Sequence, residues 1–295
     1  MSATSELPEP VYLEEKLKEI QGTGRLKYRS KALPTWCPGC GYFSMTEGVA
    51  SAMNKLGIAS KDTVIVSGIG CASRFPFFMN AYGFHSLHGR TLPVATGIKM
   101  ANDRLTVVVV GGDGDGFAIG GGHIPHAARR NVDITVFCVN NFTYGMTGGQ
   151  AGPTTQEGAR TSTTPYGAVE QPFNLPLLAT AAGATYVARW TVLDMGRLRR
   201  SMVEALGHKG FAFVEIISPC PVYYGRRNRL GEAIDELRYY KEHTVVENFA
   251  PLDALDLALN EEIMVGKFVE KERPTFADLL NERLVPMAQE AMAGT

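Results

Sequence analysis

The sequence predicts an α/β fold built on a parallel sheet with helices on both faces. Its 295 residues are 45% hydrophobic and 20% charged, as expected for a globular protein. Short apolar runs alternate along the chain with longer segments whose apolar residues recur at helical spacing. Strands that alternate with helices form parallel sheets, because each helix carries the chain back across one face.

The expected elements follow one another from residue 41 to residue 217. A long segment rich in Thr, Gly and Pro, residues 150–171, predicts a loop, and loops of this length are usually functional. The elements in order are a helix over 41–56, a strand over 63–66, a helix over 92–103, a strand over 105–110, a glycine run and helix over 119–130, a strand over 134–139, a helix over 175–182, a strand over 184–188, a helix over 193–206 and a strand over 211–217.

Composition divides the chain into three parts. Residues 1–34 are polar and predict an N-terminal arm that packs on another surface, and residues 35–225 hold the α/β domain. Residues 226–295 are charged and predict a helical C-terminal extension that ends in an amphipathic segment over 276–292. This extension has too little β pattern to form a second sheet.

Charge and hydropathy exclude several classes of function. The net charge of −1 gives no sign of a nucleic-acid partner or a membrane surface. No apolar run approaches the roughly 18 residues of a membrane span. Residues 1–10 are acidic and polar and do not resemble a signal peptide, so we expect a cytoplasmic location.

Two polar turns follow neighbouring apolar runs. Gly112-Asp113-Gly114-Asp115 ends the run before it, and Val139-Asn140-Asn141 begins 26 residues after Asp113. Parallel strands would bring this carboxylate and this amide to one sheet edge, where open α/β folds bind ligands. Carboxylate, amide and carbonyl oxygens suit Mg²⁺, and the glycines let the backbone approach a diphosphate. The alternative is two ordinary turns that close two strands.

The five cysteines also need an explanation, because disulfides are unexpected in a reducing compartment. Cys37 and Cys40 form a CxxC, while Cys71 and Cys220 each follow a predicted strand. Four thiolates suit Zn²⁺ or an iron–sulfur cluster, and unrelated free thiols or a redox CxxC are the alternatives. Cys138 lies inside a predicted strand, so we expect a small buried hydrophobe there.

The spacing of the two polar turns resembles the thiamine diphosphate motif of the transketolase-like superfamily. Over residues 30–225 the chain further resembles the β subunit of 2-oxoacid:ferredoxin oxidoreductases. The segments that carry this resemblance are Trp36-Cys37-Pro38-Gly39-Cys40-Gly41, Gly68-Ile69-Gly70-Cys71-Ala72-Ser73-Arg74, His85-Ser86-Leu87-His88-Gly89-Arg90, Gly112-Asp113-Gly114-Asp115, the stretch 140–150 and the lone Cys220.

The resemblance implies a doubly wound sheet of the thiamine diphosphate-binding type and a set of site residues. Cys37, Cys40, Cys71 and Cys220 would ligate one [4Fe–4S] cluster. Asp113, the side chain of Asn141 and the carbonyl of Thr143 would hold Mg²⁺. The residues that would contact the cofactor are Ile69, Gly70, Cys71, Ala72, His88, Gly89, Gly114, Asp115, Gly145, Met146 and Thr147.

Within that family, the segment from Gly70 to Phe77 looks most like the 2-oxoglutarate branch. The Arg74 guanidinium could pair with the distal carboxylate of this substrate. The alternatives are that Arg74 pairs with a local acid or caps a helix, and that the substrate is pyruvate or another 2-oxoacid. His88 resembles a phosphate or substrate contact.

The resemblance implies oxidative decarboxylation of a 2-oxoacid to its acyl-CoA and CO₂, with coenzyme A as co-substrate. Electrons would pass through the cluster to ferredoxin, and the same residues would serve the reverse carboxylation. Thiamine enzymes also need a glutamate from a pyrimidine-binding domain. We find one doubly wound sheet in this sequence, so we expect an α subunit to supply that glutamate in an α₂β₂ assembly.

Two other functions remain open from the sequence. One is a non-redox thiamine decarboxylase or ligase in which the cysteines bind zinc. The other is a noncatalytic scaffold or electron-transfer subunit that binds an iron–sulfur cluster but no thiamine.

Overall fold

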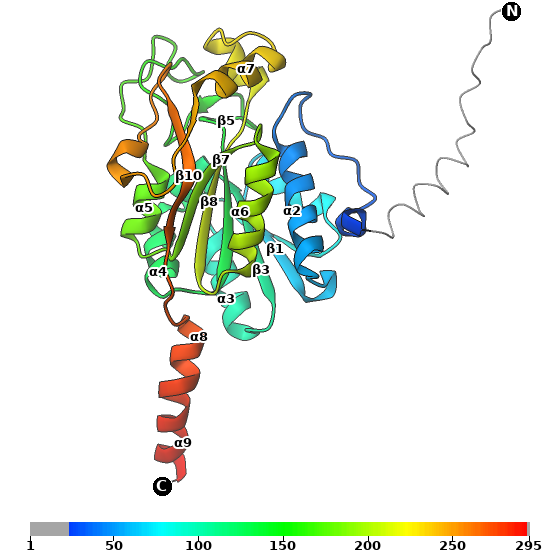
Figure 1. Ribbon diagram of the computed structural model, residues 1–295, viewed down its shortest axis with the longest axis vertical. Helices are drawn as coiled ribbons and strands as arrows, with labels where there is room; N and C mark the ends of the chain where they lie inside the picture. The colour runs from blue at the N-terminus through cyan, green and yellow to red at the C-terminus, as the bar shows by residue number, and fades with distance from the viewer. Residues whose placement is uncertain (1–23, 294–295) are drawn as a thin grey trace, which may run out of the picture.

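An eight-stranded sheet forms the centre of the protein, with helices on both faces (Figure 1). The computed structural model describes residues 24–293. The strands of the sheet are β1 (Thr63–Ser67), β2 (Tyr82–His85), β3 (Thr106–Gly112), β4 (Ile134–Asn140), β7 (Tyr186–Thr191), β8 (Phe211–Ile217), β9 (Thr244–Val246) and β10 (Ile263–Glu270). A separate antiparallel pair consists of β5 (Thr143–Tyr144) and β6 (Gln150–Ala151).

The strand order in the sheet is β2-β1-β3-β4-β8-β7-β10-β9. All pairs from β2 to β7 are parallel, and only β10 runs antiparallel to its neighbour β7. The predicted α/β doubly wound fold is therefore confirmed. The carboxyl ends of β1, β3, β4 and β8 share one edge, so the loops that follow them can build a common site.

The helices lie in two layers. On one face, α2 (Tyr42–Leu56) packs against α6 (Met195–Gly207); the other face carries α3 (Thr91–Ala101), α4 (Ile124–Arg129) and α5 (Leu175–Ala181). The C-terminal part adds α7 (Ala233–His243), α8 (Phe276–Leu279) and α9 (Val285–Ala293). The 3₁₀ turns are η1 (Gly24–Tyr28), η2 (Ser60–Asp62), η3 (Ala72–Phe78), η5 (Gly121–His123) and η7 (Leu252–Leu255), and the π-helical turns are η4 (Gly114–Ile119), η6 (Pro221–Gly225) and η8 (Leu280–Leu284).

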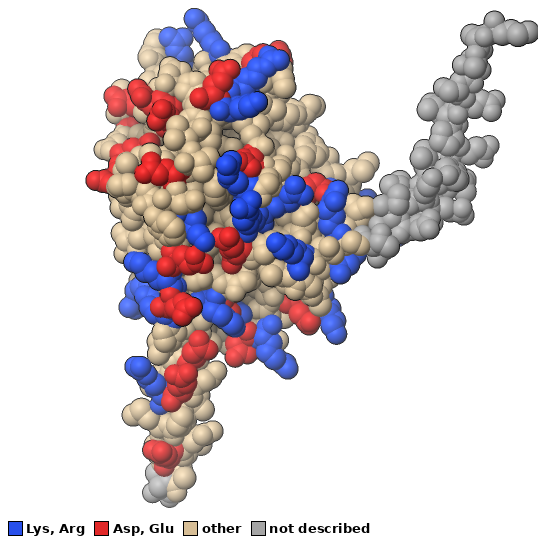
Figure 2. All heavy atoms as spheres, viewed as in Figure 1, with Lys and Arg blue, Asp and Glu red and all other residues tan. Residues whose placement is uncertain are grey.

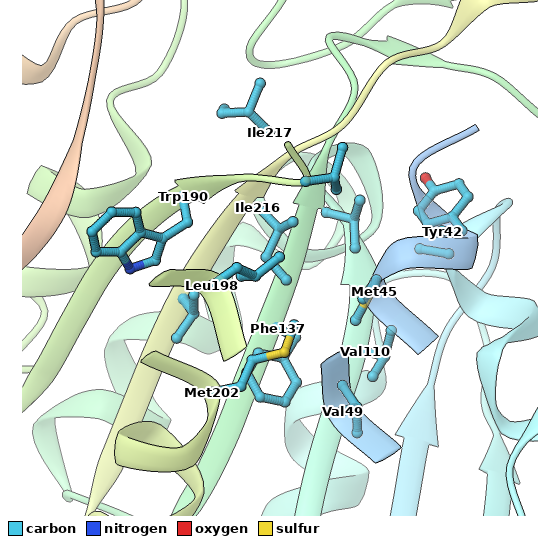
Figure 3. Packing of buried hydrophobic residues seen from close by; sticks show 14 of the residues in the cluster. Tyr42, Met45, Val49, Val110, Phe137, Trp190, Leu198, Met202, Ile216 and Ile217 are labelled. Atoms are coloured by element: carbon cyan, nitrogen blue, oxygen red, sulfur yellow. The ribbon is translucent and has the colours of Figure 1, made fainter. Parts of the chain in front are cut away.

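A close-packed apolar layer joins α2 and α6 to the sheet (Figure 3). Met45 on α2 and Met202 on α6 are fully buried, and both lie over strand residues such as Phe137. Burying side chains of this size contributes about 1.5–3 kcal/mol each. This layer fixes the start of α2, at Tyr42, beside the sheet edge where the strands end.

Side chains at the helix ends explain where several helices begin. The Asn174 carboxamide oxygen accepts a hydrogen bond from the Leu177 amide (3.0 Å), and the Asp194 carboxylate accepts one from the Arg197 amide (3.0 Å). Such caps satisfy amides that have no partner within the helix.

The C-terminal part differs from the helical extension expected over 226–295. It contributes β9 and β10, and β10 extends the main sheet beyond β7. A register shift between Lys267 and Val269 breaks the two-residue alternation of buried and exposed positions in β10. The sequence therefore lacks the alternating pattern from which a strand is predicted. The extension is thus not helical throughout.

Two further strands depart from the sequence expectation. The strand expected at 184–188 runs instead from Tyr186 to Thr191, through the fully buried Arg189. The charged Arg189 interrupts the apolar pattern of the sequence, but in the structure a buried ion pair with Glu215 neutralises its charge. The edge strand β2 is exposed at all four positions and therefore gives no burial signal at all.

The ends and the long loop complete the fold. Of the expected arm over 1–34, residues 1–23 lie outside the described range; η1 and the residues after it pack against α2. The C-terminal helix formed by α8, η8 and α9 projects from the body, as Figure 1 shows. Residues 152–174 contain no helix or strand, as expected for a long loop. No helix within residues 24–293 is long and apolar enough to cross a membrane.

The ion pair between Arg189 and Glu215 is fully buried, with Nε and Oε2 2.6 Å apart. We expect Arg189→Met to lower the free energy of unfolding by about 3–5 kcal/mol, because it leaves the Glu215 charge buried without its partner. Urea denaturation followed by circular dichroism measures this loss. The matched control is Arg238→Met, which breaks an exposed pair with Asp235 and should cost less than about 1 kcal/mol. Equal losses of unfolding free energy in the two variants would contradict the conclusion that breaking the buried Arg189–Glu215 pair is the costly change.

Candidate functional site

A cavity of about 90 Å³ lies where β1, β3 and β4 end. Loops from three strands and the start of α2 line it. The lining residues are Tyr42, Ile69, Gly70, Cys71, Ala72, His88, Gly112, Asp113, Gly114, Asp115, Asn141, Thr143, Tyr144, Gly145, Met146 and Thr147. The structure thus brings the cofactor and magnesium residues proposed from the sequence to one place, with Gly89 buried beside them. Tyr42 and Tyr144 were not foreseen, because isolated tyrosines carry no motif.

The Asp115 carboxylate ties the loops after three strands together. Its Oδ1 atom accepts hydrogen bonds from the backbone amides of Ile69 (3.1 Å) and Gly89 (2.8 Å), and it lies 2.7 Å from Nδ1 of His88. Its Oδ2 atom is buried and has no hydrogen-bond partner in the described structure. A Cβ atom at Gly68 would collide with this carboxylate, so only glycine allows the loop after β1 to come this close. The position of Asp115 is therefore structural as well as central to the site.

The Asp113 carboxylate is held from the opposite side by the long loop. Thr154 Oγ1 lies 2.7 Å from Asp113 Oδ2 and 2.8 Å from Asn140 Oδ1, and all three side chains are buried. Burial raises the pKa of Asp113 to about 6, and the hydrogen bond from Thr154 opposes this rise. A buried carboxylate that is costly to ionise is stabilised by a bound cation. Thr154 could not be found from the sequence, because it reaches the site from a loop without regular structure.

The network continues into the core. Asn140 Nδ2 donates to Glu215 Oε1 (2.7 Å), and Glu215 forms the buried pair with Arg189. Arg189 Nη1 donates in turn to the carbonyl of Leu255 (2.8 Å). A chain of polar contacts therefore runs from Asp113, through β4 and β8, to β7.

The turn after β4 presents oxygen atoms to the cavity. Phe142 adopts a φ of 61°, a left-handed conformation that is uncommon for a bulky residue and is found at sites where the surroundings impose it. The Asn141 carboxamide is oriented at both ends: the Thr143 amide donates to its Oδ1 (3.4 Å), and its Nδ2 donates to the Tyr42 hydroxyl (3.5 Å). The Thr143 hydroxyl donates a hydrogen bond to the Gln150 carbonyl (2.7 Å). The backbone carbonyl of Thr143 is the candidate metal ligand.

Four of the five cysteines gather beside this cavity. A Cβ atom added at Gly145 would lie 3.6 Å from the sulfur of Cys71 and 3.7 Å from that of Cys220, so both sulfurs flank this glycine. Cys37 is close enough for its charge to raise the pKa of Cys40 and Cys71, and the charges of Cys71 and Cys220 also raise the pKa of Cys40. Trp36 anchors the CxxC loop through a hydrogen bond from Nε1 to the Cys71 carbonyl (2.8 Å).

Burial makes three of these thiols costly to ionise. Burial raises the pKa of Cys40 to about 12 and that of Cys71 to about 11, and it raises the pKa of Cys220 as well. Thiolates are the metal ligands, so ionisation here requires a compensating positive charge. Within residues 24–293, no three or more His, Cys, Asp or Glu side chains are close enough to hold a metal ion. Cys138, by contrast, lies in the core of β4, 3% exposed, as the sequence indicated.

Glu236 on α7 is an unforeseen member of the cysteine region. Its Oε1 atom accepts hydrogen bonds from the Cys220 amide (3.0 Å) and the Tyr240 hydroxyl (3.3 Å), while its buried Oε2 has no partner in the described structure. Burial raises the pKa of Glu236 to about 7. The sequence shows only a charged helix at this point.

Arg74 lies at the rim and not inside the cavity. Its side chain is exposed, and Nη1 donates to the Thr35 hydroxyl (2.8 Å). No acidic partner within the described residues engages Arg74. Its proposed role in substrate binding stays a prediction.

Comparisons with known proteins agree with this geometry. Residues 68–216 match the C-terminal TPP-binding domain of thiamine pyrophosphate enzymes. The chain is 44% identical over 267 residues to 2-oxoglutarate synthase subunit KorB of Methanocaldococcus jannaschii. The aligned region covers 90% of this chain and 98% of that protein. It is 42% identical to the β subunit of 2-oxoacid:ferredoxin oxidoreductase 2 of Aeropyrum pernix, over 67% of this chain and 64% of that protein.

A solved structure extends the likeness to three dimensions. The 2-oxoglutarate:ferredoxin oxidoreductase of Magnetococcus marinus, with 2-oxoglutarate, coenzyme A and succinyl-CoA bound, superimposes with a TM-score of 0.82 at 37% identity. The match covers 91% of this chain and 92% of that chain. By sequence and by structure, the chain belongs to the family of 2-oxoacid:ferredoxin oxidoreductase β subunits, to which the KorB proteins belong.

Proposed function

We propose that this chain is the β subunit of an enzyme that oxidatively decarboxylates 2-oxoglutarate to its acyl-CoA and CO₂ and passes the electrons to ferredoxin. Its relatives support this activity: the KorB proteins are 2-oxoglutarate synthase subunits, and the similar solved structure holds 2-oxoglutarate, coenzyme A and succinyl-CoA. The observation that carries the proposal is the convergence of an oxygen-rich turn and four thiols on one cavity at the sheet edge.

Mg²⁺ would be held by Asp113 Oδ, the Asn141 carboxamide oxygen and the Thr143 carbonyl. These are the oxygen ligands that Mg²⁺ shares with phosphates. The protein's contribution is rigidity, because Thr154 fixes the Asp113 carboxylate and Tyr42 fixes the Asn141 amide group. Gly112 and Gly145 line the cavity without a side chain, so a diphosphate could approach the backbone there.

Thiamine diphosphate, when bound, supplies the carbon nucleophile and the electron sink for decarboxylation. The residues of this chain hold and shield it. His88, which is held by Asp115, would direct its second ring nitrogen, Nε2, toward phosphate or substrate. Ile69, Ala72 and Met146 provide apolar surface that keeps water away from the reacting centre.

Cys37, Cys40, Cys71 and Cys220 would ligate one [4Fe–4S] cluster. The thiols are near enough to raise one another's pKa. Four thiolates suit either Zn²⁺ or an iron–sulfur cluster, and the redox chemistry proposed for this chain favours the cluster. Cys71 also lines the cofactor cavity, so the path of the electrons from cofactor to cluster would be short.

An α subunit would complete the active site. The cavity of about 90 Å³ is far smaller than the roughly 300–1,000 Å³ of typical small-molecule sites, so this chain can cover only part of the cofactor. The α subunit would supply the remaining walls, including the glutamate at the pyrimidine ring, in an α₂β₂ assembly. Arg74, exposed at the rim, would pair with the distal carboxylate of the substrate once the site is closed.

The variant Asp113→Asn tests the magnesium site. It keeps the size of the side chain but removes the charge that the cation needs, so the Kd for thiamine diphosphate in the presence of Mg²⁺ should rise more than about 100-fold. Isothermal titration calorimetry on the αβ complex measures this change. Asp103→Asn, at an exposed turn, is the matched control and should bind normally. Unchanged binding by Asp113→Asn would refute the assignment.

The cluster ligands are tested with two cysteine variants. Cys220→Ala removes one proposed ligand, so iron and acid-labile sulfide should fall to a small fraction of the wild-type content after anaerobic purification. Cys138→Ala removes a thiol of equal size from the core of β4 and should keep its iron. Metal analysis and the visible absorption spectrum give the readout. Zinc in place of iron in the unmodified protein would disprove the cluster.

Substrate choice is tested with Arg74→Met in the reconstituted αβ enzyme under anaerobic conditions. Loss of a charge-assisted contact to the distal carboxylate should lower kcat/KM for 2-oxoglutarate about 10- to 100-fold, the equivalent of about 1.5–3 kcal/mol. The rate with pyruvate, which has no such carboxylate, should change little. The β chain alone should show no activity with either substrate. Equal losses with both substrates would exclude this role for Arg74.

A further inference from the structure

The segments that carry the four cysteines are basic and contain no acidic residue. Residues 24–41, 68–90 and 216–231 contain four, two and three Lys or Arg residues and neither Asp nor Glu. The chain as a whole is nearly balanced, with 29 basic and 30 acidic residues. Basic residues are therefore concentrated in the three segments of the sequence that carry these cysteines.

Most of these cations are free to meet a partner. Arg25 and Arg29 pair with Glu47 at 2.9 and 2.7 Å. Lys31, Arg226, Arg227 and Arg229 are exposed and form no ion pair with any residue in the described range 24–293. Figure 2 shows basic side chains projecting at the end of the molecule that carries α7.

Direct contacts bring the three segments together into one surface. Gly39 lies against the loop after β8, since a Cβ atom there would come within 3.5 Å of Pro221 Cγ. Arg74 reaches Thr35, two residues before Cys37. Cys37 is the exposed member of the four thiols, whereas Cys40, Cys71 and Cys220 are partly buried.

Apolar side chains accompany the charges. Leu33 is 84% exposed and Phe77 is 57% exposed, and the hydrogen bond from the Ser30 hydroxyl to the Phe77 carbonyl (2.7 Å) keeps their segments adjacent. Exposed apolar groups beside a charged rim are characteristic of a protein-docking surface.

The acidic residues that follow segment 216–231 in the sequence, at the start of α7, make local contacts. Glu232 and Asp235 form a capping box at the start of α7, and Asp235 also pairs with Arg238 at 2.8 Å. Glu236 is buried and bound to Cys220. The Oε2 atom of Glu236 has no hydrogen-bond partner in the described structure, but it is buried and does not reach the surface.

We propose that the surface formed by Lys31, Leu33, Phe77, Arg226 and Arg227 around Cys37, here called the Cys37 surface, docks a small acidic electron-carrier protein. The inference rests on the proposed function, because it assumes electrons at the four cysteines. Conversion of one 2-oxoacid anion and one coenzyme A thiol to acyl-CoA and CO₂ releases two electrons and one proton. The electrons reduce two one-electron carriers in turn, and the proton goes to solvent.

Attraction between a basic Cys37 surface and an acidic carrier suits repeated docking and release. Two carrier molecules must arrive and leave in each turnover, so rapid encounter matters more than tight binding. Opposite charges raise association rates by about 10- to 1,000-fold, and the effect falls with ionic strength. The Cys37 surface places the exposed sulfur at the point of contact.

The test uses the anaerobic αβ holoenzyme carrying Arg226→Glu and Arg227→Glu. With a purified acidic bacterial ferredoxin as acceptor, kcat/KM for ferredoxin should fall at least about tenfold, mainly through a higher KM. The salt dependence of the wild-type rate should also flatten. With methyl viologen, a small dye that needs no docking, 2-oxoglutarate oxidation should not fall.

The matched control is Lys55→Glu with Lys61→Glu, which makes the same change of charge at the opposite end of β1. This variant should behave as the wild type with both acceptors. Equal losses of kcat/KM for ferredoxin in the two double variants, or no loss in the arginine variant, would overturn the docking proposal. Reduction of viologen by the same enzymes would still support the proposed function. A raised KM for coenzyme A in the viologen assay would assign the arginines to that phosphate-bearing co-substrate instead. Failure of the wild-type holoenzyme to reduce viologen would refute the proposed function itself.

Discussion

The Asp115 carboxylate is the contact on which the geometry of the site depends. A single oxygen atom of Asp115 binds the loops after β1 and β2 to the turn after β3. Loops normally move more than the strands they follow, and a site built from three of them would be loose without such a tie. Because the residue sits at the first turn after a buried strand, the sheet transmits its rigidity to the cavity.

A second constraint reaches the site from within the sheet. The contacts from Asp113 through Thr154, Asn140 and Glu215 to Arg189 cross three strands without interruption. A buried ion pair is a weak source of stability, because the cost of desolvation offsets the attraction. Its place here is better understood as positional: it fixes the Asn140 amide group, and with it the turn that presents Asn141.

Much of the fold and the positions of the site residues could be predicted from the sequence, because motifs at strand ends combine a local pattern with a known place in space. Asp113, Asn141, Cys71 and Cys220 belong to this class, whereas Cys37 and Cys40 form a CxxC shortly before α2. Tyr42, Thr154 and Glu236 do not, since they approach the site from a helix start, an irregular loop and the C-terminal part. β10 was missed because its bulge breaks the alternation, and β7 was misplaced because a buried arginine resembles a surface residue. Tertiary contacts decide these cases, and no short window of sequence contains them.

The exposure of Cys37 has a further consequence. If Cys37 ligates the proposed cluster, its sulfur would lie open both to a protein carrier and to small oxidants, which need neither docking nor complementary charge. Steric shielding at Cys37 therefore cannot admit a carrier protein and exclude dioxygen. Protection would then have to come from timing: the shorter the time that an electron stays on the proposed cluster, the less often an oxidant would meet that cluster in its reduced state. A shortage of carriers would lengthen the time for which the reduced cluster is exposed to oxidants.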